Sequence, residues 1–427
     1  MAFEMSGNFK KIKCGKLYDG IKAEFQKDKE VLIEGKFIKE IGYNLPCPEG
    51  TEITDLSDLT VTPGMIDAHV HPQYFYWKDV YASDTIFNSD GYRALATAAC
   101  ARKTLLGGFT TIRSLGWARE AYELDVKRAI EEGHIEGSRM VVSSHVICTP
   151  GSHGDMTQVV RNNPYLSDYM ASLYPAIGNG ADFFTGIVRR ERKMGYDFLK
   201  IMATGGFASP NDSPEDIQLN DAELKAIFDT AKEVKISTTA HVYAPALMQK
   251  LMGFGITGME HGSLMDKETA KMFEDTGTYL VPTFCPYEDV IHPDSKSMAK
   301  KDPFFRRKLE LYQERLQKGR EIIIGSNIKL GYGTDLVTVH NNHECGWEYN
   351  AWLSNGMNPF RILHAATKVN AEICEIADKA GTLEPGKYAD IAGWKRNLLT
   401  DPDALRDCAF VMKEGRVYQA ESRMNED

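Results

Sequence analysis

The chain has 427 residues, of which 43% are hydrophobic, and a formal net charge of −10 at pH 7. This length suits one large domain plus a smaller one, and the composition allows a large core and argues against disorder. The excess of acidic over basic residues argues against nucleic acid or an anionic membrane as the main partner. The sequence contains no run of about 18 apolar residues, so we expect no transmembrane helix.

The first sixty residues have the pattern of short strands separated by Gly, Asp and Pro turns. The expected strands are Phe9–Leu17, Glu30–Glu34, Phe37–Ile41 and Glu52–Thr54. The segment VLIEGKFIKEIG is typical of a hairpin that turns at Gly35–Lys36.

The middle of the chain alternates between strand and helix patterns. The eight expected strands are Gly64–His71, Phe109–Ser114, Arg139–Ile147, Asp197–Ala203, Lys235–His241, Ile256–His261, Tyr279–Phe284 and Lys329–Thr334. The clearest helices between them are Tyr92–Leu106, Glu120–Glu132, Phe183–Met194, Ala222–Val234 and Lys267–Asp275. Asn220-Asp221-x-Glu223 gives one of these helices a capping sequence.

Strands that alternate with helices predict βαβ units and an α/β fold with parallel strands. Eight repeats favour a closed (β/α)8 TIM barrel, which we expect to span residues 63–381. An open doubly wound sheet is the alternative, but no G-x-G-x-x-G follows the first strand.

The C-terminal segment returns to the pattern of the first sixty residues. ADIAGW predicts a strand, and FVMKEGRVY predicts a hairpin that turns at Glu414–Gly415. Because both ends are rich in strands, we expect residues 1–62 and 382–427 to form one composite β-sandwich domain beside the barrel.

Several histidines fall at the ends of the predicted barrel strands. His69 and His71 end the first strand, where residues i and i+2 point to the same face and can bind one metal ion. His241 and His261 end the fifth and sixth strands, and Asp335 ends the eighth. A single histidine at a strand end is usually structural, but this set converges on one mouth of a closed barrel, so we favour metal ligation.

Lys200 lies within the apolar fourth strand, in the sequence FLKIM, where a charged ammonium is costly to bury. A nearby carboxylate can pair with it, or the side chain can reach the rim of the barrel. Reaction with CO2 is a third possibility, because it turns the cation into a carbamate anion whose two oxygens can bridge two metals.

These motifs together resemble the binuclear, carboxylated-lysine type of the amidohydrolase superfamily. The resemblance rests on PGMIDAHVH, the lysine of strand four, the histidines of strands five and six, GTD, and the C-terminal HAATKVNAEICEIADKAGTLEPGKYADIAGW, and it covers nearly the whole chain. KIMATGG and TPGSHGD look like the prolidase-like branch, which includes metal-dependent Xaa-Pro and Xaa-Arg dipeptidases and ochratoxin-type amidases. The loop that follows HVHP departs from the family pattern.

The resemblance implies a hydrolase with two divalent metal ions per subunit, usually Zn²⁺, and a CO2-derived carbamate on Lys200. His69, His71 and Asp335 would then bind one metal, His241 and His261 the second, and carboxylated Lys200 both. A hydroxide between the metals would attack the amide, with Asp335 as the catalytic proton carrier and the second metal polarising the carbonyl.

Two further residues are expected to bind substrate. His153 follows strand three and Tyr243 follows His241, and residues so placed in the dipeptidase branch hold the substrate's free carboxylate. The alternative for Tyr243 is packing at the barrel rim. His340 and His343 either line the pocket or lie on a solvated helix start, and the remaining histidines are interpreted as structural: His134, His145, His292 and His364.

We therefore expect a metal-dependent amidohydrolase that cleaves a dipeptide or N-acyl amino acid with a free C-terminal carboxylate. The rivals are a mononuclear deaminase or cyclic amidase of the same fold, and a non-catalytic assembly protein that would be expected to lose metal ligands. The aromatic residues of the loop Tyr74–Tyr81 form either an apolar acyl pocket or a subunit interface.

Partners and compartment follow from what the sequence contains. We expect a small-molecule substrate, no nucleic acid, no membrane association and, from the resemblance, a homo-oligomer. Eight scattered cysteines without a C-x-x-C pair, and an N-terminus without a signal-peptide core, favour the cytoplasm.

Overall fold

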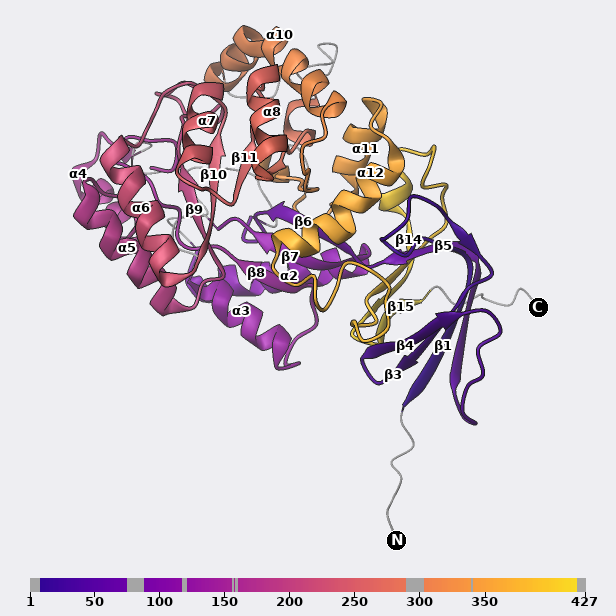
Figure 1. Ribbon diagram of the computed structural model, residues 1–427. Helices are drawn as coiled ribbons and strands as arrows, with labels where there is room; N and C mark the ends of the chain where they lie inside the picture. Colours follow the sequence, from indigo (N-terminus) through magenta and orange to yellow (C-terminus); the bar gives the residue numbers. More distant parts are fainter. Residues whose placement is uncertain are drawn as a thin grey trace.

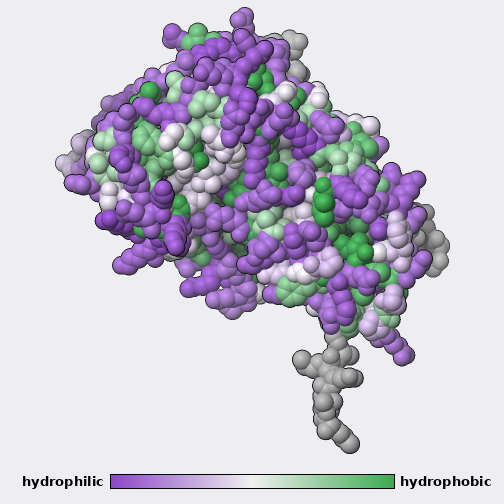
Figure 2. All heavy atoms as spheres, viewed as in Figure 1, coloured by the Kyte–Doolittle hydropathy of each residue, from purple (hydrophilic) through white to green (hydrophobic). Residues whose placement is uncertain are grey.

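The computed structural model describes residues 8–74, 88–116, 121–155, 157, 160–288, 303–338 and 341–420 (Figure 1). It has an α/β fold with parallel sheets surrounded by helices, and a further sheet lies to one side, at the lower right of Figure 1. Among the described helices, none is both long and apolar enough to cross a membrane. Hydrophilic residues cover most of the face seen in Figure 2.

The sheet at the side of the molecule joins the two ends of the chain. Its strand order is β15-β14-β13-β5-β1-β3-β4, with β2 paired to β1. The strands are β1 Phe9–Leu17, β2 Gln26–Lys27, β3 Glu30–Glu34, β4 Phe37–Gly42, β5 Glu52–Pro63, β13 Ile391–Trp394, β14 Cys408–Lys413 and β15 Arg416–Ala420. β13 pairs antiparallel with β5, with Ile391 opposite Pro63. The division of the chain at residues 62 and 382, and the two-layered form of that domain, stay predictions.

The other strands form two parallel sheets. One has the order β6-β7-β8 and the other β12-β11-β10-β9. Their bounds are β6 Met65–Val70, β7 Phe109–Ser114, β8 Arg139–Val142, β9 Phe198–Met202, β10 Ser237–Val242, β11 Gly258–His261 and β12 Tyr279–Val281. Single parallel bridges connect Ser143 with Phe198 and Leu280 with Leu330.

The expected barrel is therefore not closed as one continuous sheet, and the eighth strand expected at Lys329–Thr334 is wrong as a regular strand. Side chains take backbone N–H groups that a strand ladder would use. Tyr332 N donates to Asn370 Oδ1, and Thr334 N donates to Asp67 Oδ1. A side chain also replaces a backbone partner at the third expected strand, Arg139–Ile147, which is shortened to β8. There Lys200 N donates to the hydroxyl Oγ of Ser144.

Helices cover the outside of the parallel strands (Figure 1). The α-helices are α2 Asp90–Leu106, α3 Tyr122–Glu131, α4 Pro164–Ser172, α5 Ala181–Met194, α6 Asp221–Val234, α7 Pro245–Gly253, α8 Lys267–Thr276, α10 Pro303–Gly325, α11 Gly346–Ser354, α12 Pro359–His364 and α13 Asn370–Ile373. Short helical turns are η2 Cys285–Tyr287, η4 Leu336–Thr338, the π-helix η5 Ala365–Val369 and η6 Ala404–Arg406.

Helix α6 illustrates how local sequence fixes these elements. Asn220 accepts hydrogen bonds from Ala222 N and Glu223 N, and Glu223 accepts one from Asn220 N, so the predicted capping box is confirmed. The buried apolar residues of the helix recur at helical spacing, so its apolar face packs against the core. They are Leu224, Ile227, Phe228 and Ala231.

Candidate active site

All eight residues that the sequence singled out line one cavity of about 70 Å³. They are His69, His71, His153, Lys200, His241, Tyr243, His261 and Asp335. The cavity lies at the carboxyl ends of the parallel strands, because His261 ends β11 and His241 is the penultimate residue of β10. A larger cavity of about 760 Å³ lies at the opposite strand ends, beside Arg139 and Phe198, and contains none of the eight. We place the site in the small cavity because the groups able to ligate a metal converge there.

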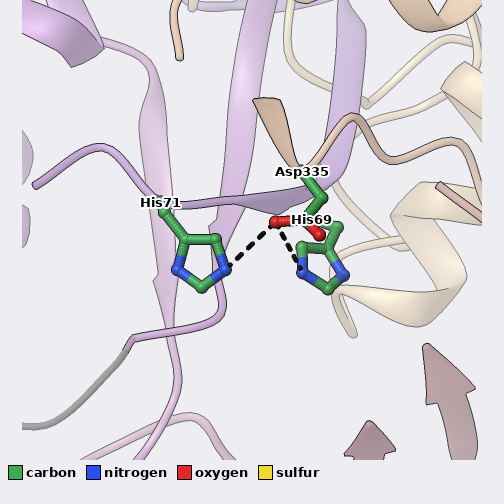
Figure 3. Close-up of side chains that lie close together, drawn as sticks. All are labelled: His69, His71 and Asp335. Carbon is green, nitrogen blue, oxygen red and sulfur yellow. Dashed lines mark ion pairs between the residues drawn. The ribbon is translucent and has the colours of Figure 1, made fainter. Parts of the chain in front are cut away.

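Three of these residues form a cluster of ligand atoms (Figure 3). His69 Nε2 and His71 Nε2 lie 3.6 Å and 3.5 Å from Asp335 Oδ1, and the ligand atoms of all three lie within 4.8 Å of one another. Asp335 N donates a 2.9 Å hydrogen bond to the His69 carbonyl, which holds the carboxylate beside β6. The spacing and the donor set suit one divalent metal ion.

The backbone is strained around this cluster. Asp335, His261 and Thr283 all have positive φ, at 46°, 68° and 46°. Left-handed backbone is unfavourable for a β-branched residue such as Thr283, and such conformations cost of order 1–3 kcal/mol each. Thr283 uses the conformation to bring its Oγ1 2.7 Å from His261 Nδ1.

The second group of predicted ligands lies next to the first. The ring centroids of His241 and His261 are 4.6 Å apart, and those of His69 and His261 are 5.1 Å apart. Burial lowers the pKa of His71, His241 and His261 well below the ordinary value, and neighbouring positive charges lower it further. Neutral imidazole is the form that ligates a metal, so these rings suit that role.

Lys200 of β9 is 2% exposed and faces the same cavity. Among the described residues, the ammonium of Lys200 makes no hydrogen bond, and no carboxylate lies within 4 Å of it. The bond between Lys200 and the Ser144 hydroxyl uses the backbone N–H of Lys200 instead. Burial lowers its pKa to about 8, against the attraction of Glu260 and Asp335. The simple ion pair considered from the sequence is thus not formed within the described part of the chain.

Glu260 was missed by the sequence analysis. It precedes His261 on β11, is fully buried, and its Oε2 accepts a 2.8 Å hydrogen bond from His69 Nδ1. That bond fixes the imidazole so that Nε2 faces Asp335. Its other oxygen accepts from Thr239 Oγ1 at 2.6 Å and Arg113 Nη1 at 3.0 Å. Burial raises the pKa of Glu260, but Arg113 and His69 outweigh burial and hold it below the ordinary range.

The signal for Glu260 was present in GMEHG, because an acidic residue in an apolar strand needs a partner just as Lys200 does. Arg113 on β7 is the buried partner of Glu260. Its guanidinium also lies 3.9 Å from the Phe198 ring centroid and donates a 2.8 Å hydrogen bond to the Tyr279 hydroxyl. Nothing in the sequence indicates which basic residue does so.

His153 is held by a second polar network. Its ring stacks on His241 with centroids 4.4 Å apart, and Nδ1 lies 2.7 Å from Ser209 Oγ and 3.7 Å from Asp212. Lys308 of α10 donates to Asp212 Oδ1 at 2.9 Å and to the carbonyls of Gly206 and Ser209. Burial raises the pKa of Asp212, but His153, Ser209 and Lys308 outweigh it and hold it well below the usual range.

Aromatic side chains also line the cavity, and we call Phe207, Tyr243, Tyr287 and Phe305 the aromatic wall. The hydroxyls of Tyr243 and Tyr287 are hydrogen-bonded to each other, and burial raises both pKa values. Phe207 meets Tyr243 and Tyr287 edge-on, with centroids 5.0 Å and 5.5 Å away. Tyr287, Phe207 and Phe305 were not foreseen.

The remaining histidines lie away from this cavity or outside the described residues. His145 pairs with buried Glu191 at 2.8 Å, and His134 lies exposed beside Glu132. His343 is described but does not line the cavity, whereas His292 and His340 fall outside the described residues. Of the loop Tyr74–Tyr81 only Tyr74 is described, and its ring lies 6.2 Å from His71.

Comparison with known proteins agrees with the geometry. The model of the amidohydrolase family matches residues 60–420. The ochratoxinase of Aspergillus niger is 25% identical over 414 residues, which cover 91% of this chain and 82% of that protein. A solved Xaa-Pro dipeptidase with bound methionine is 27% identical, with a TM-score of 0.83 over 96% of this chain and 100% of that one. The structure of A. niger ochratoxinase gives a TM-score of 0.82 at 22% identity, over 97% of this chain and 96% of that one.

Proposed function

We propose that this chain, which belongs to the amidohydrolase family and is a hydrolase acting on amide bonds, cleaves a dipeptide or an N-acyl amino acid with a free C-terminal carboxylate. The observation that carries the proposal is the convergence of four imidazoles, a buried lysine and a carboxylate on one cavity that also contains His153 and Tyr243. The similarity to a Xaa-Pro dipeptidase supports the peptide substrate.

The same proposal includes the architecture around the site. We infer a (β/α)8 barrel in which the segment that follows Ile328 takes the place of the eighth strand. The bridge between Leu280 and Leu330, and the hydrogen bond from Ala68 N to the Tyr332 carbonyl, support this inference. A composite β-sandwich domain of residues 1–62 and 382–427 is consistent with the pairing of β5 with β13.

Divalent metal ions are the general cofactor of the family, and the cluster of His69, His71 and Asp335 fits one. We propose that His241 and His261 hold a second ion and that carboxylated Lys200 holds both, with zinc as the metal. Conversion of the amine to a carbamate removes a buried cation that has no ion-pair partner among the described residues. When bound, the metals supply Lewis acidity and lower the pKa of a bound water.

Asp335 is the proton carrier in this proposal. Its Oδ1 faces both His69 and His71, and burial raises its pKa even though His69 and Lys200 act in the opposite direction. From this position the carboxylate can accept a proton from the attacking water and deliver it to the leaving amine nitrogen. This transfer leaves the acid group on one product and the neutral amine on the other.

His153 and Tyr243 orient the substrate. Both lie against His241, with ring centroids 4.4 Å and 4.9 Å from it, so a carboxylate bound by them sets the adjacent amide over the ligand cluster. Each hydrogen bond to a charged group contributes about 1.5–3 kcal/mol. Loss of one such bond should therefore lower kcat/KM by roughly tenfold to a hundredfold.

The substrate test compares dipeptides and N-acyl amino acids with their C-terminal amides, using metal-loaded protein. We expect the amides to lose most of the rate, and Tyr243→Phe to impair the free acids much more than the amides. Equal turnover of acids and amides would reject the free-carboxylate substrate and leave a hydrolase of another amide, such as a cyclic amide.

The metal test separates a binuclear amidohydrolase from a mononuclear deaminase and from a non-catalytic protein. We expect close to two divalent ions per chain in elemental analysis, and loss of both metal and turnover in Lys200→Ala, with partial rescue by short carboxylic acids. One ion in fully active protein would favour the deaminase, and none in purified protein would favour the non-catalytic assembly protein.

A further inference from the structure

We propose that the aromatic wall selects substrates whose C-terminal residue has an apolar side chain, and that it discriminates against arginine, lysine and acidic residues there. This inference rests on the proposed function, because it names the substrate class of that same site. It is carried by the composition of the cavity wall and by the position of that wall relative to His153.

The wall offers an apolar side chain many contacts and a charged one no partner. Beside the four aromatic residues, the other apolar residues that line the cavity are Met202, Ala208, Pro286 and Val337. Among the described lining residues the only carboxylate is Asp335, which already lies within the cluster with His69 and His71. A guanidinium or ammonium that entered would lose its hydration without gaining an ion pair.

The charges around the wall point the same way. Lys308, one helical turn from Phe305 on α10, is already engaged, because its ammonium is bound by two carbonyls and Asp212. Asp212 is in turn bound to Lys308 and to Ser209, so it is not available to a cationic substrate. An acidic side chain placed against Phe207 and Phe305 would likewise lose its hydration to apolar rings.

The wall begins directly beside the group that holds the carboxylate. A Cβ atom added to Gly206 would lie 2.3 Å from Cε1 of His153, so the backbone of this loop packs directly on the imidazole. Phe207 follows at once and is 1% exposed. Since the α-carboxylate and the side chain of an amino acid share one carbon atom, a carboxylate at His153 brings that side chain to Phe207.

The cavity must widen to admit a substrate. About 70 Å³ is much smaller than the roughly 300–1,000 Å³ of typical ligand pockets. Phe305 lies in the first turn of α10, in the same apolar cluster as Phe207 and Tyr287. An apolar substrate side chain replaces the contacts that Phe305 loses when it moves aside, whereas a charged one does not.

The first experiment measures kcat/KM of metal-loaded protein for Ala-Phe, Ala-Leu, Ala-Ala, Ala-Arg and Ala-Asp. We expect Ala-Phe and Ala-Leu to exceed Ala-Arg and Ala-Asp by at least about 30-fold, a difference that an unpaired buried charge can produce. Ala-Arg cleaved as fast as Ala-Phe would overturn the selectivity alone. No cleavage of these peptides or of the N-acetyl forms of the same C-terminal residues would overturn the proposed function and this inference with it.

Two variants then test the residues. Phe305→Ala should lower kcat/KM for Ala-Phe by about tenfold and that for Ala-Ala by less than about threefold, because only the larger side chain reaches the wall. Leu311→Ala is the matched control, since Leu311 lies on the same helix and is 75% exposed. It should change neither value, and an equal loss on both peptides in Phe305→Ala would overturn the role of Phe305.

The second variant keeps the proposal open to refutation if Phe305→Ala does not fold. Ala208→Glu adds a carboxylate at a partly exposed position of the cavity wall. It should raise the ratio of Ala-Arg to Ala-Phe cleavage by at least about tenfold, and make arginine a better competitive inhibitor than leucine. An unchanged ratio and unchanged inhibition would contradict the assignment of this wall to the C-terminal side chain.

Discussion

The two sides of the cavity are built differently. On the ligand-cluster side, the side chains come from strand ends, and buried partners such as Glu260 fix their orientation. The aromatic wall comes instead from the loops after β9 and β10, the turn η2 and helix α10, and packing plus the contacts of Lys308 hold it together. The proposed metal ligands thus sit at strand ends, whereas the residues proposed to contact the substrate side chain sit on loops and at a helix start, which generally vary more than strands.

The largest effect should come from the ligand cluster itself. Asp335→Asn keeps the size of the side chain but removes the proposed proton acceptor and the proposed anionic metal ligand, so kcat should fall by at least about a thousandfold. A strong chelator should abolish the activity of the wild-type protein in the same assay. The circular dichroism spectrum should be unchanged, and an Asp335→Asn protein with a tenth of the activity would refute the role of Asp335.

The next largest effect should come from the partner of His69. Glu260→Gln weakens the hydrogen bond that orients the imidazole, and changes of this kind typically cost about 10–100-fold in metal affinity or activity. It also leaves Arg113 without its buried counter-charge, so Tm should fall. Metal content after dialysis and Tm are the two measurements.

Glu191→Gln is the matched control for that prediction. Glu191 is also fully buried and also lies 2.8 Å from a histidine, His145, but that pair does not line the cavity. It should lower Tm while metal content stays at the wild-type level. Equal loss of metal from both variants would show that any buried carboxylate supports the site through stability alone.

Asp212 gives a pH-dependent test of the wall side. Its pKa in the folded chain is below the ordinary 3.8, so the unfolded state binds the proton more readily. The stability that Asp212 contributes is therefore present above about pH 4 and is lost as the pH falls through the folded pKa. Asp212→Asn should cost about 2 kcal/mol at pH 7, from the loss of charged hydrogen bonds.

The measurement for Asp212 is urea unfolding at several pH values. The difference between wild-type protein and Asp212→Asn should shrink steadily below pH 4, because the carboxylate becomes protonated there in the unfolded chain while it stays ionised in the folded one. A difference that stays constant from pH 7 to the acid range would indicate that the ionic form of Asp212 contributes nothing.

The smallest effect should come from Lys308, which holds α10 to the loop after β9. Lys308→Met keeps the length of the side chain and removes three hydrogen bonds to Gly206, Ser209 and Asp212. A looser wall should raise KM for Ala-Phe by about threefold to tenfold with little change in kcat. Arg315→Met serves as the control, because Arg315 lies farther along α10 and forms a more exposed ion pair with Glu215. An unchanged KM in Lys308→Met would contradict a wall held by the Lys308 contacts.

Most of the ligand-cluster side could be predicted from the sequence. The two-residue spacing of His69 and His71, and the strand ends at His241 and His261, are local patterns that do not depend on which strands pair. The capping box of α6 and most helix and strand bounds follow for the same reason. The prediction of a regular eighth strand was wrong, because two of its backbone N–H groups donate to the side chains of Asn370 and Asp67, which are distant in sequence.

The tertiary structure decided which charged residues, far apart in the sequence, form ion pairs. Arg113 and Glu260 are 147 residues apart and Lys308 and Asp212 are 96 apart, and no local pattern links either pair. A buried charge in an apolar strand shows that a partner is needed, but which residue supplies it depends on how strands and helices pack. The sequence by itself therefore determined the chemical groups of the site, whereas the packing decided which buried partners orient them and which aromatic residues line the cavity beside them.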